Sequence, residues 1–170
     1  MTKRAVTINV NGAEHPVQVE PHDRLIDVLR DQLGLKSVKE GCSTGDCGIC
    51  AVMVDGRLVN SCLMLAAQCD GRRVTTLEGL PALYARQRNL ASPPALHPLQ
   101  RAMIEEQAPQ CGYCYNGMII KGAELLSQKP QPSEREVREA MNGHLCRCGS
   151  YPRIMKAIVL ASRIMAEERQ

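Results

Sequence analysis

Eight of the nine cysteines in this chain fall into two groups whose spacing is typical of metal ligands. The first group is Cys42, Cys47, Cys50 and Cys62, with gaps of four, two and eleven residues between successive members. Three cysteines in one short loop and a distant fourth are the ligand spacing of plant-type [2Fe–2S] proteins. Such a cluster would tie a loop to a remote part of the chain, so this group constrains the fold more than any other feature.

The glycines of the first group indicate how the chain can wrap a compact anionic cluster. Gly41, Gly45 and Gly48 lie beside or between the cysteines. Glycine adopts positive φ angles and lets backbone N–H groups approach the sulfur atoms. A zinc site is the alternative, but zinc ribbons are usually built from two C-x2-C pairs. A disulfide loop fits less well, because the chain shows no export signal.

The second group consists of Cys111, Cys114, Cys146 and Cys148. Its last two members flank Arg147, and since residues i and i+2 face opposite sides of a helix, this segment is predicted to be a turn. The turn precedes a helix opened by Pro152, and the first two members begin another helix, so two helix N-termini would face the four thiolates. Alone, this group would suit structural zinc as well as a cluster; beside the first group, a second [2Fe–2S] cluster is favoured.

Two further residues bear on the ligand count. His144 is an alternative ligand, although a loop residue after a helix end is the simpler interpretation. Cys69 is left over from both groups, and we interpret it as a small buried residue.

The first half of the chain is predicted to be mostly β. Hydrophobic and polar residues alternate on both sides of Asn11-Gly12, which predicts one β-hairpin; Ala51 to Val54 and Arg57 to Val59, joined by Asp55-Gly56, are predicted to form a second. Between them, apolar residues at helical spacing follow Asp23, which is predicted to cap the helix. This pattern predicts a β-grasp, plant-type ferredoxin-like domain over residues 1–80.

The second half is predicted to be helical. Residues 81–97 are rich in proline and lack periodicity, so they are predicted to be a linker. Beyond them lie four amphipathic segments, which begin near Leu99, Met118, Ser133 and Pro152. Residues 98–170 are therefore predicted to form a four-helix bundle that binds the second cluster. The predicted fold class is α+β, with a β-grasp N-terminal domain and an all-α C-terminal domain.

Composition and charge argue against several functions. The chain has no Trp, no Phe and four Tyr, so it offers little aromatic surface on which nucleic acid bases could stack. The formal charge of +3 falls to about −1 when two clusters of roughly −2 each are added. No apolar stretch is long enough to span a membrane, and no signal peptide is visible. We therefore expect no nucleic-acid partner, no direct membrane span and a cytoplasmic location.

Both cysteine groups together resemble one protein family. The motifs Gln110-Cys111-Gly112-Tyr113-Cys114 and Leu145-Cys146-Arg147-Cys148-Gly149, after the first group, are similar to those of the small iron–sulfur subunit of xanthine oxidase-type molybdenum hydroxylases. The resemblance implies two [2Fe–2S] clusters and a large partner subunit that carries molybdopterin cytosine dinucleotide. It also implies that the chain relays electrons from that partner to an external acceptor, as one subunit of an oxidoreductase whose catalytic centre lies in the partner.

The resemblance further implies roles for individual residues. Gln110 and Cys148 would approach the pterin of the partner, and the first group would pass electrons outward. Tyr115-Asn116-Gly117 stands where the family usually has Thr-Pro-Gly. Together with Cys148-Gly149-Ser150-Tyr151-Pro152-Arg153, this motif resembles the isoquinoline, nicotinate and aldehyde oxidoreductase branches more than the carbon monoxide dehydrogenase branch. The substrate is therefore expected to be an aldehyde or an N-heteroaromatic compound. The chain has no FAD-binding segment, so electrons would leave through an FAD-binding subunit, a cytochrome c subunit or a soluble carrier.

Two alternatives stay open at this point. A free-standing two-cluster ferredoxin or redox sensor would contain the same ligands, and would be stable and cluster-loaded when expressed alone. The location also has an alternative, because a partner that carries a signal could take this chain to the periplasm by co-export.

Overall fold

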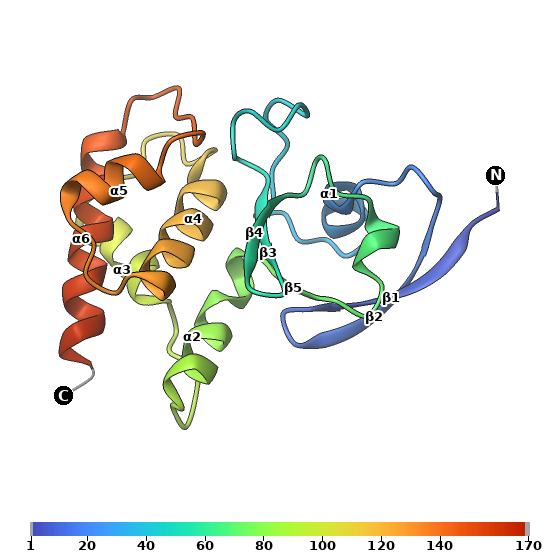
Figure 1. The fold of residues 1–170 in the computed structure, drawn as a ribbon, viewed down its shortest axis with the longest axis horizontal. Coiled ribbons are helices and arrows are strands. Elements are labelled where there is room, and N and C mark those ends of the chain that lie inside the picture. The colour runs from blue at the N-terminus through green and yellow to red at the C-terminus, as the bar shows by residue number, and fades with distance from the viewer. Residues whose placement is uncertain (1, 169–170) are drawn as a thin grey trace.

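The computed structural model describes residues 2–168, and it is elongated, with a sheet at one end and helices at the other (Figure 1). The strands are β1 (Arg4–Val10), β2 (Ala13–Val19), β3 (Ala51–Val54), β4 (Arg57–Asn60) and β5 (Arg73–Thr75). The α-helices are α1 (Leu25–Asp27), α2 (Leu80–Arg88), α3 (Pro98–Glu105), α4 (Tyr115–Gln128), α5 (Glu134–Ala140) and α6 (Tyr151–Glu167). A ferredoxin-like first half and a helical second half make the fold α+β.

The five strands form one mixed sheet in the order β2-β1-β5-β3-β4. β1 is antiparallel to β2 and parallel to β5, whereas β3 is antiparallel to both β4 and β5. Both predicted hairpin turns are confirmed. Asn11-Gly12 has φ angles of 55° and 96°, and Asp55-Gly56 has 49° and 81°, as a tight turn with two left-handed residues requires.

The predicted helix after the first hairpin is present, but the predicted N-cap is wrong. Arg24 occupies the N-cap position of α1, which continues as a π-helical turn over Val28–Gln32. The carboxylate of Asp23 instead accepts a 2.8 Å hydrogen bond from the backbone N–H of Glu20. Asp23 therefore closes the turn that precedes the helix, a competing use that short acidic side chains commonly have.

The segment 81–97, predicted to be a linker, is helical in its first half. Pro81 lies in the first turn of α2, where its missing N–H costs no helical hydrogen bond. Leu80 and Tyr84 are buried against the helices of the second half. The helix ends at Asn89, which has a φ of 53°, and residues 90–97 are irregular. The number of prolines indicated a linker here. The prediction missed the helix because a proline can stand either in the first turn of a helix or in a loop, and the sequence pattern did not distinguish the two.

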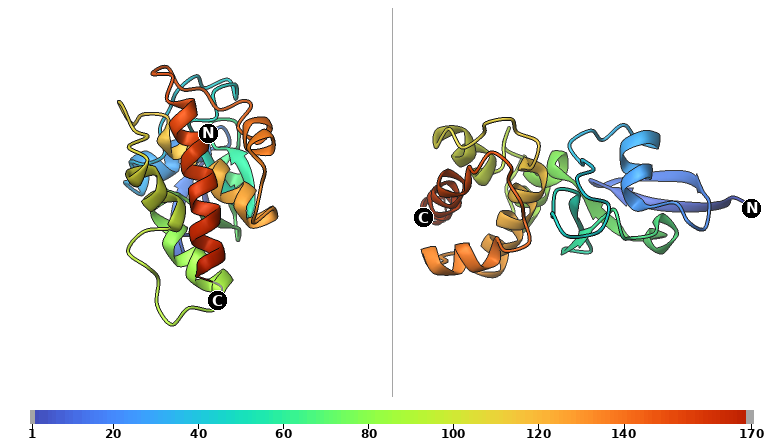
Figure 2. Two further views of the ribbon diagram at one scale, coloured as in Figure 1. Left: turned by 90° about the vertical axis from the view of Figure 1, so that its left-hand side faces the viewer. Right: turned by 90° about the horizontal axis from the view of Figure 1, so that it is seen from above.

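Helices α3 to α6 lie where the four amphipathic segments were predicted, and Figure 2 shows α6 as the long outer helix. The capping box predicted at Ser133 is confirmed, since its hydroxyl accepts from the Glu136 N–H while that glutamate accepts from the Ser133 N–H. Within residues 2–168, the structure has no helix that is both long and apolar enough to cross a membrane.

The two halves share strand β3, whose four residues are all buried. Val52 and Val54 pack into the core between the sheet and α1, whereas Ala51 and Met53 pack against the helices. Because side chains alternate across a strand, one short strand belongs to both cores. The halves are therefore joined by a continuous packed contact.

A buried histidine gives the helical half a dependence on pH. His97 caps α3, and its Nδ1 accepts a 3.0 Å hydrogen bond from the Leu99 N–H. Burial, with a smaller contribution from Arg88, lowers the pKa of His97 to about 4. Because the unfolded chain keeps a histidine pKa of about 6.5, it binds the proton first, and stability is lost as the pH falls from about 6.5 toward 4.

We expect the wild-type chain to lose about 2 kcal/mol more stability between pH 7.5 and pH 5 than a His97→Asn variant. Asparagine keeps a capping acceptor but does not titrate. Unfolding of both proteins followed by circular dichroism at the two pH values measures the difference. The same loss in both proteins would show that His97 does not carry this dependence.

Candidate metal centres

The four cysteines of the first group meet between the loop over residues 41–50 and the end of β4. The Cys42 thiol contacts that of Cys47, and the Cys50 thiol contacts that of Cys62, so the group consists of two close pairs. The charge of Cys42 also acts on Cys62, which places the two pairs near each other. Three members are buried, and Cys42 is partly exposed at the rim.

The glycines of this loop act as predicted. Gly45 and Gly48 have φ angles of 87° and 68°, which few other residues adopt. A Cβ on Gly41 would lie 2.7 Å from the Sγ atom of Cys47, so this position has no room for a side chain.

Hydrogen bonds and burial act in opposite directions on these thiols. The side chain and backbone N–H of Thr44 lower the pKa of Cys42 to about 6. Burial raises the pKa of Cys62 to about 11 and also raises that of Cys47. Iron is bound by thiolates, so Cys42 is already disposed to lose its proton and bind iron. Cys47 and Cys62 must release their protons when the cluster is inserted.

The second group also consists of two pairs. The Sγ atoms of Cys111 and Cys148 are 3.4 Å apart, and Cys114 contacts Cys146. Cys114 immediately precedes α4, and Cys146 and Cys148 lie in the turn before α6, as predicted. Two helix N-termini therefore border the group and favour negative charge.

Exposure differs across the second group. Cys111 is exposed, and the backbone N–H of Tyr113 lowers its pKa. Burial raises the pKa of Cys114 to about 12. Burial alone would raise the pKa of Cys146 too, but hydrogen bonds from Ser150 and from Cys114 bring it below its usual range.

The donor set at each group fits a [2Fe–2S] cluster. Such a cluster has two irons, each bound by two thiolates, and each group supplies two close thiol pairs. A single zinc ion instead needs four ligands around one point. The buried Tyr115 hydroxyl beside Cys114 has no hydrogen-bond partner, which suits a neighbouring sulfur acceptor.

The two groups lie back to back across the contact between the halves. The backbone N–H of Leu145 donates a 3.0 Å hydrogen bond to the carbonyl of Cys47, and Leu145 directly precedes Cys146. A Cβ on Gly48 would lie 2.6 Å from the ring of His144, so backbone and ring are in close contact here. One hydrogen bond therefore separates the backbone of a first-group ligand from that of a second-group ligand.

The structure also places the other residues that the sequence singled out. The side chain of Gln110 donates a 3.2 Å hydrogen bond to the carbonyl of Cys148, so the two lie together at the surface. His144 is buried, and neither ring nitrogen has a partner. Asn116 is a residue that sequence reasoning did not single out, although its side chain connects the two groups. The sequence offered one sign of this residue, which is that asparagine stands at a position where the family usually has proline.

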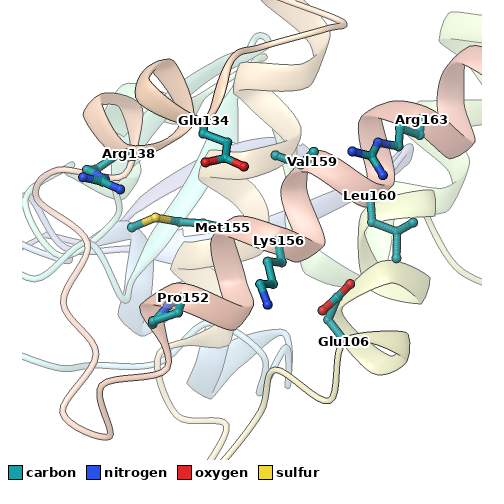
Figure 3. A pocket seen from close by; sticks show the side chains of 9 residues that line it. All are labelled: Glu106, Glu134, Arg138, Pro152, Met155, Lys156, Val159, Leu160 and Arg163. Carbon is teal, nitrogen blue, oxygen red and sulfur yellow. The ribbon is translucent and has the colours of Figure 1, made fainter.

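A groove of about 380 Å³ lies elsewhere, between α5, α6 and the end of α3 (Figure 3). Glu134, Arg138 and Lys156 give it a charged lining, and none of its lining residues is a cysteine. It is therefore separate from both cysteine groups.

Both halves match family models for iron–sulfur domains. Residues 8–75 match the model described as a 2Fe-2S iron-sulfur cluster binding domain, and residues 86–159 match the [2Fe-2S] binding domain. The chain is 42% identical over 158 residues to the nicotinate dehydrogenase small FeS subunit of Eubacterium barkeri, covering 93% of this chain and 94% of that one. The chain belongs to the small [2Fe–2S] subunits of xanthine oxidase-type molybdenum hydroxylases.

Solved structures agree with this family. The subunit matches quinoline 2-oxidoreductase from Pseudomonas putida 86 with a TM-score of 0.86 and 35% identity, covering 98% of both chains. It matches aldehyde oxidoreductase from Desulfovibrio desulfuricans with a TM-score of 0.85 and 38% identity, covering 99% of this chain and 18% of that chain. The same fold thus occurs as a separate chain and as part of a much longer one.

Proposed function

We propose that this subunit relays electrons from the molybdopterin site of a large subunit, through two [2Fe–2S] clusters, to an external acceptor. Electrons would enter at the second cysteine group and leave through the first. The observation that carries the proposal is the hydrogen bond from Leu145 to Cys47, which joins the two groups, while Cys111 leaves the second group exposed at the surface. The eight cysteines would hold the clusters, and helices α3 to α6 would form the four-helix bundle around the second cluster.

The surface beside Gln110 and Cys148 would face the large subunit and its molybdopterin cytosine dinucleotide. Tyr113 and Leu145 are 49% and 53% exposed and lie next to the ligands of the second group. Apolar side chains exposed around a cofactor ligand favour a protein contact. Gln110 is hydrogen-bonded to the carbonyl of Cys148, so both would approach the pterin from one side.

The relatives suggest the substrate class and further partners. Their names include nicotinate, quinoline and aldehyde enzymes, so we propose an aldehyde or N-heteroaromatic substrate that binds to the large subunit. Electrons would leave the first group to an FAD-binding subunit, a cytochrome c subunit or a soluble carrier. We keep the cytoplasm as the proposed location, with co-export to the periplasm as the alternative.

Metal analysis separates this proposal from a zinc module. We expect about four irons per chain, because each of the two clusters contains two irons. Iron and zinc measured by plasma emission, with the visible absorption spectrum, check this. A colourless protein that contains zinc would contradict both cluster assignments.

Copurification tests the partner. We expect a tagged subunit to copurify with a larger protein that contains molybdenum, and its clusters to be reduced when substrate of that partner is added. A stable, cluster-loaded monomer that copurifies with no such protein would favour the free-standing ferredoxin or redox sensor.

A further inference from the structure

The side chain of Asn116 connects the second cysteine group to the first. Asn116 lies in the first turn of α4, two residues after Cys114, and is only 1% exposed. Its Nδ2 donates hydrogen bonds of 2.8 Å to the Ile49 carbonyl and 2.9 Å to the Ala51 carbonyl. These two carbonyls flank Cys50, so one amide from the helical half holds the backbone on both sides of a first-group ligand.

The orientation of this amide follows from its two partners. Both neighbours are carbonyl oxygens, so the NH2 group must face them, because the Asn116 oxygen could only accept. That oxygen is buried and has no partner. Gly117 makes the approach possible, since a Cβ there would overlap the carbonyl oxygen of Gly48.

We propose that Asn116 is a positioning residue that sets the rate of electron transfer between the two clusters. This inference rests on the proposed relay and adds a residue to it. In the step concerned, one electron leaves a ferrous iron at the second group, which becomes ferric, and reduces a ferric iron at the first group to ferrous. No proton or other group is transferred.

Two physical effects support this role. Besides the route through Leu145 and Cys47, a second route of covalent bonds with a single hydrogen bond runs from Cys114 through Asn116 and Ile49 to Cys50. Electrons tunnel more readily through such bonded routes than through a gap, so the second route adds to the rate. In addition, a carbonyl that accepts a hydrogen bond polarises its own peptide group. The Ile49 carbonyl shares its peptide group with the Cys50 N–H, so this polarisation places more positive charge on the backbone of a first-group ligand, which favours the reduced cluster. Losing the amide should therefore slow the transfer and lower the potential of the first cluster.

The test compares Asn116→Leu with Gln100→Leu in the copurified complex. Leucine has the same branched shape and number of heavy atoms but donates nothing. Gln100→Leu removes another amide hydrogen bond between the halves, the 3.3 Å bond from its Nε2 to the Leu77 carbonyl, which does not flank a cysteine. Redistribution of electrons between the clusters is followed optically after flash reduction with a photoreduced deazaflavin, and potentials are measured by titration with electron paramagnetic resonance.

We expect Asn116→Leu to slow the redistribution roughly tenfold and to lower the potential of the first cluster, while Gln100→Leu leaves both unchanged. Equal effects of the two variants, or no effect of Asn116→Leu, would overturn the proposal. If Asn116→Leu does not load both clusters, Asn116→Ala, which removes the amide without adding volume, is measured and judged by the same outcomes. Flash reduction needs no substrate, so this test of Asn116 is independent of the proposed relay. The relay itself would fail if substrate did not reduce the clusters of the wild-type complex.

Discussion

The Cys111→Ala variant should lose the second cluster and keep the first. Cys111 is the exposed member of its group, so removing its thiol leaves the packed core around Cys114 intact. Iron should fall from about four to about two per chain, and electron transfer from substrate to an external acceptor should fall to background. Iron analysis and electron paramagnetic resonance of the reduced protein, which distinguishes the two clusters, measure both effects.

Cys69→Ala is the matched control for this variant. Cys69 is fully buried in the core beside the sheet and belongs to neither group. Burial raises its pKa to about 11, so it stays a neutral thiol at ordinary pH. Its replacement should leave both cluster signals in place. Equal loss of both signals in Cys111→Ala would refute the existence of two independent sites.

Gly117→Ala should destabilise the contact between the two halves of the subunit. A Cβ at this position would overlap the Gly48 carbonyl oxygen and lie 2.8 Å from its carbonyl carbon. Both are backbone atoms of the first ligand loop, which cannot rotate away as a side chain could. We expect the free energy of unfolding to fall by about 3 kcal/mol and the apparent Tm to fall by about 10 °C. Thermal unfolding of the loaded protein, followed by cluster absorbance, measures this.

Gly122→Ala provides the comparison within the same helix. A Cβ there would lie 2.7 Å from a terminal methyl of Leu99 and 3.2 Å from Ile158 Cγ1. The end of a flexible side chain can move, and alanine favours the helix by about 1 kcal/mol over glycine. The apparent Tm should therefore change far less than in Gly117→Ala. Similar losses in the two variants would show that contact with the ligand loop is not what makes Gly117 necessary.

Local patterns in the sequence predicted the elements well, since the physical cause of each lies within a few residues. The two hairpins follow from Asn11-Gly12 and Asp55-Gly56, whose positive φ angles suit those residue types. The Ser133 capping box was predicted for the same reason. Asp23 and the helix α2 were missed because the residues concerned serve two purposes. An aspartate caps a helix or closes a turn, and a proline begins a helix or interrupts one.

The two ligand groups could be recognised from the amino-acid sequence alone. Cysteines a few residues apart are kept close by the chain itself, whatever the arrangement of the two halves. The contacts that join the two groups depend on how the halves pack and are visible only in the tertiary structure. The contacts of Leu145 with Cys47, and of Asn116 with the carbonyls beside Cys50, connect residues more than 60 positions apart. They exist because β3 is buried on both faces, which brings α4 against the first ligand loop. No local pattern in the sequence encodes that packing. The packing is what connects the two cysteine groups through hydrogen bonds.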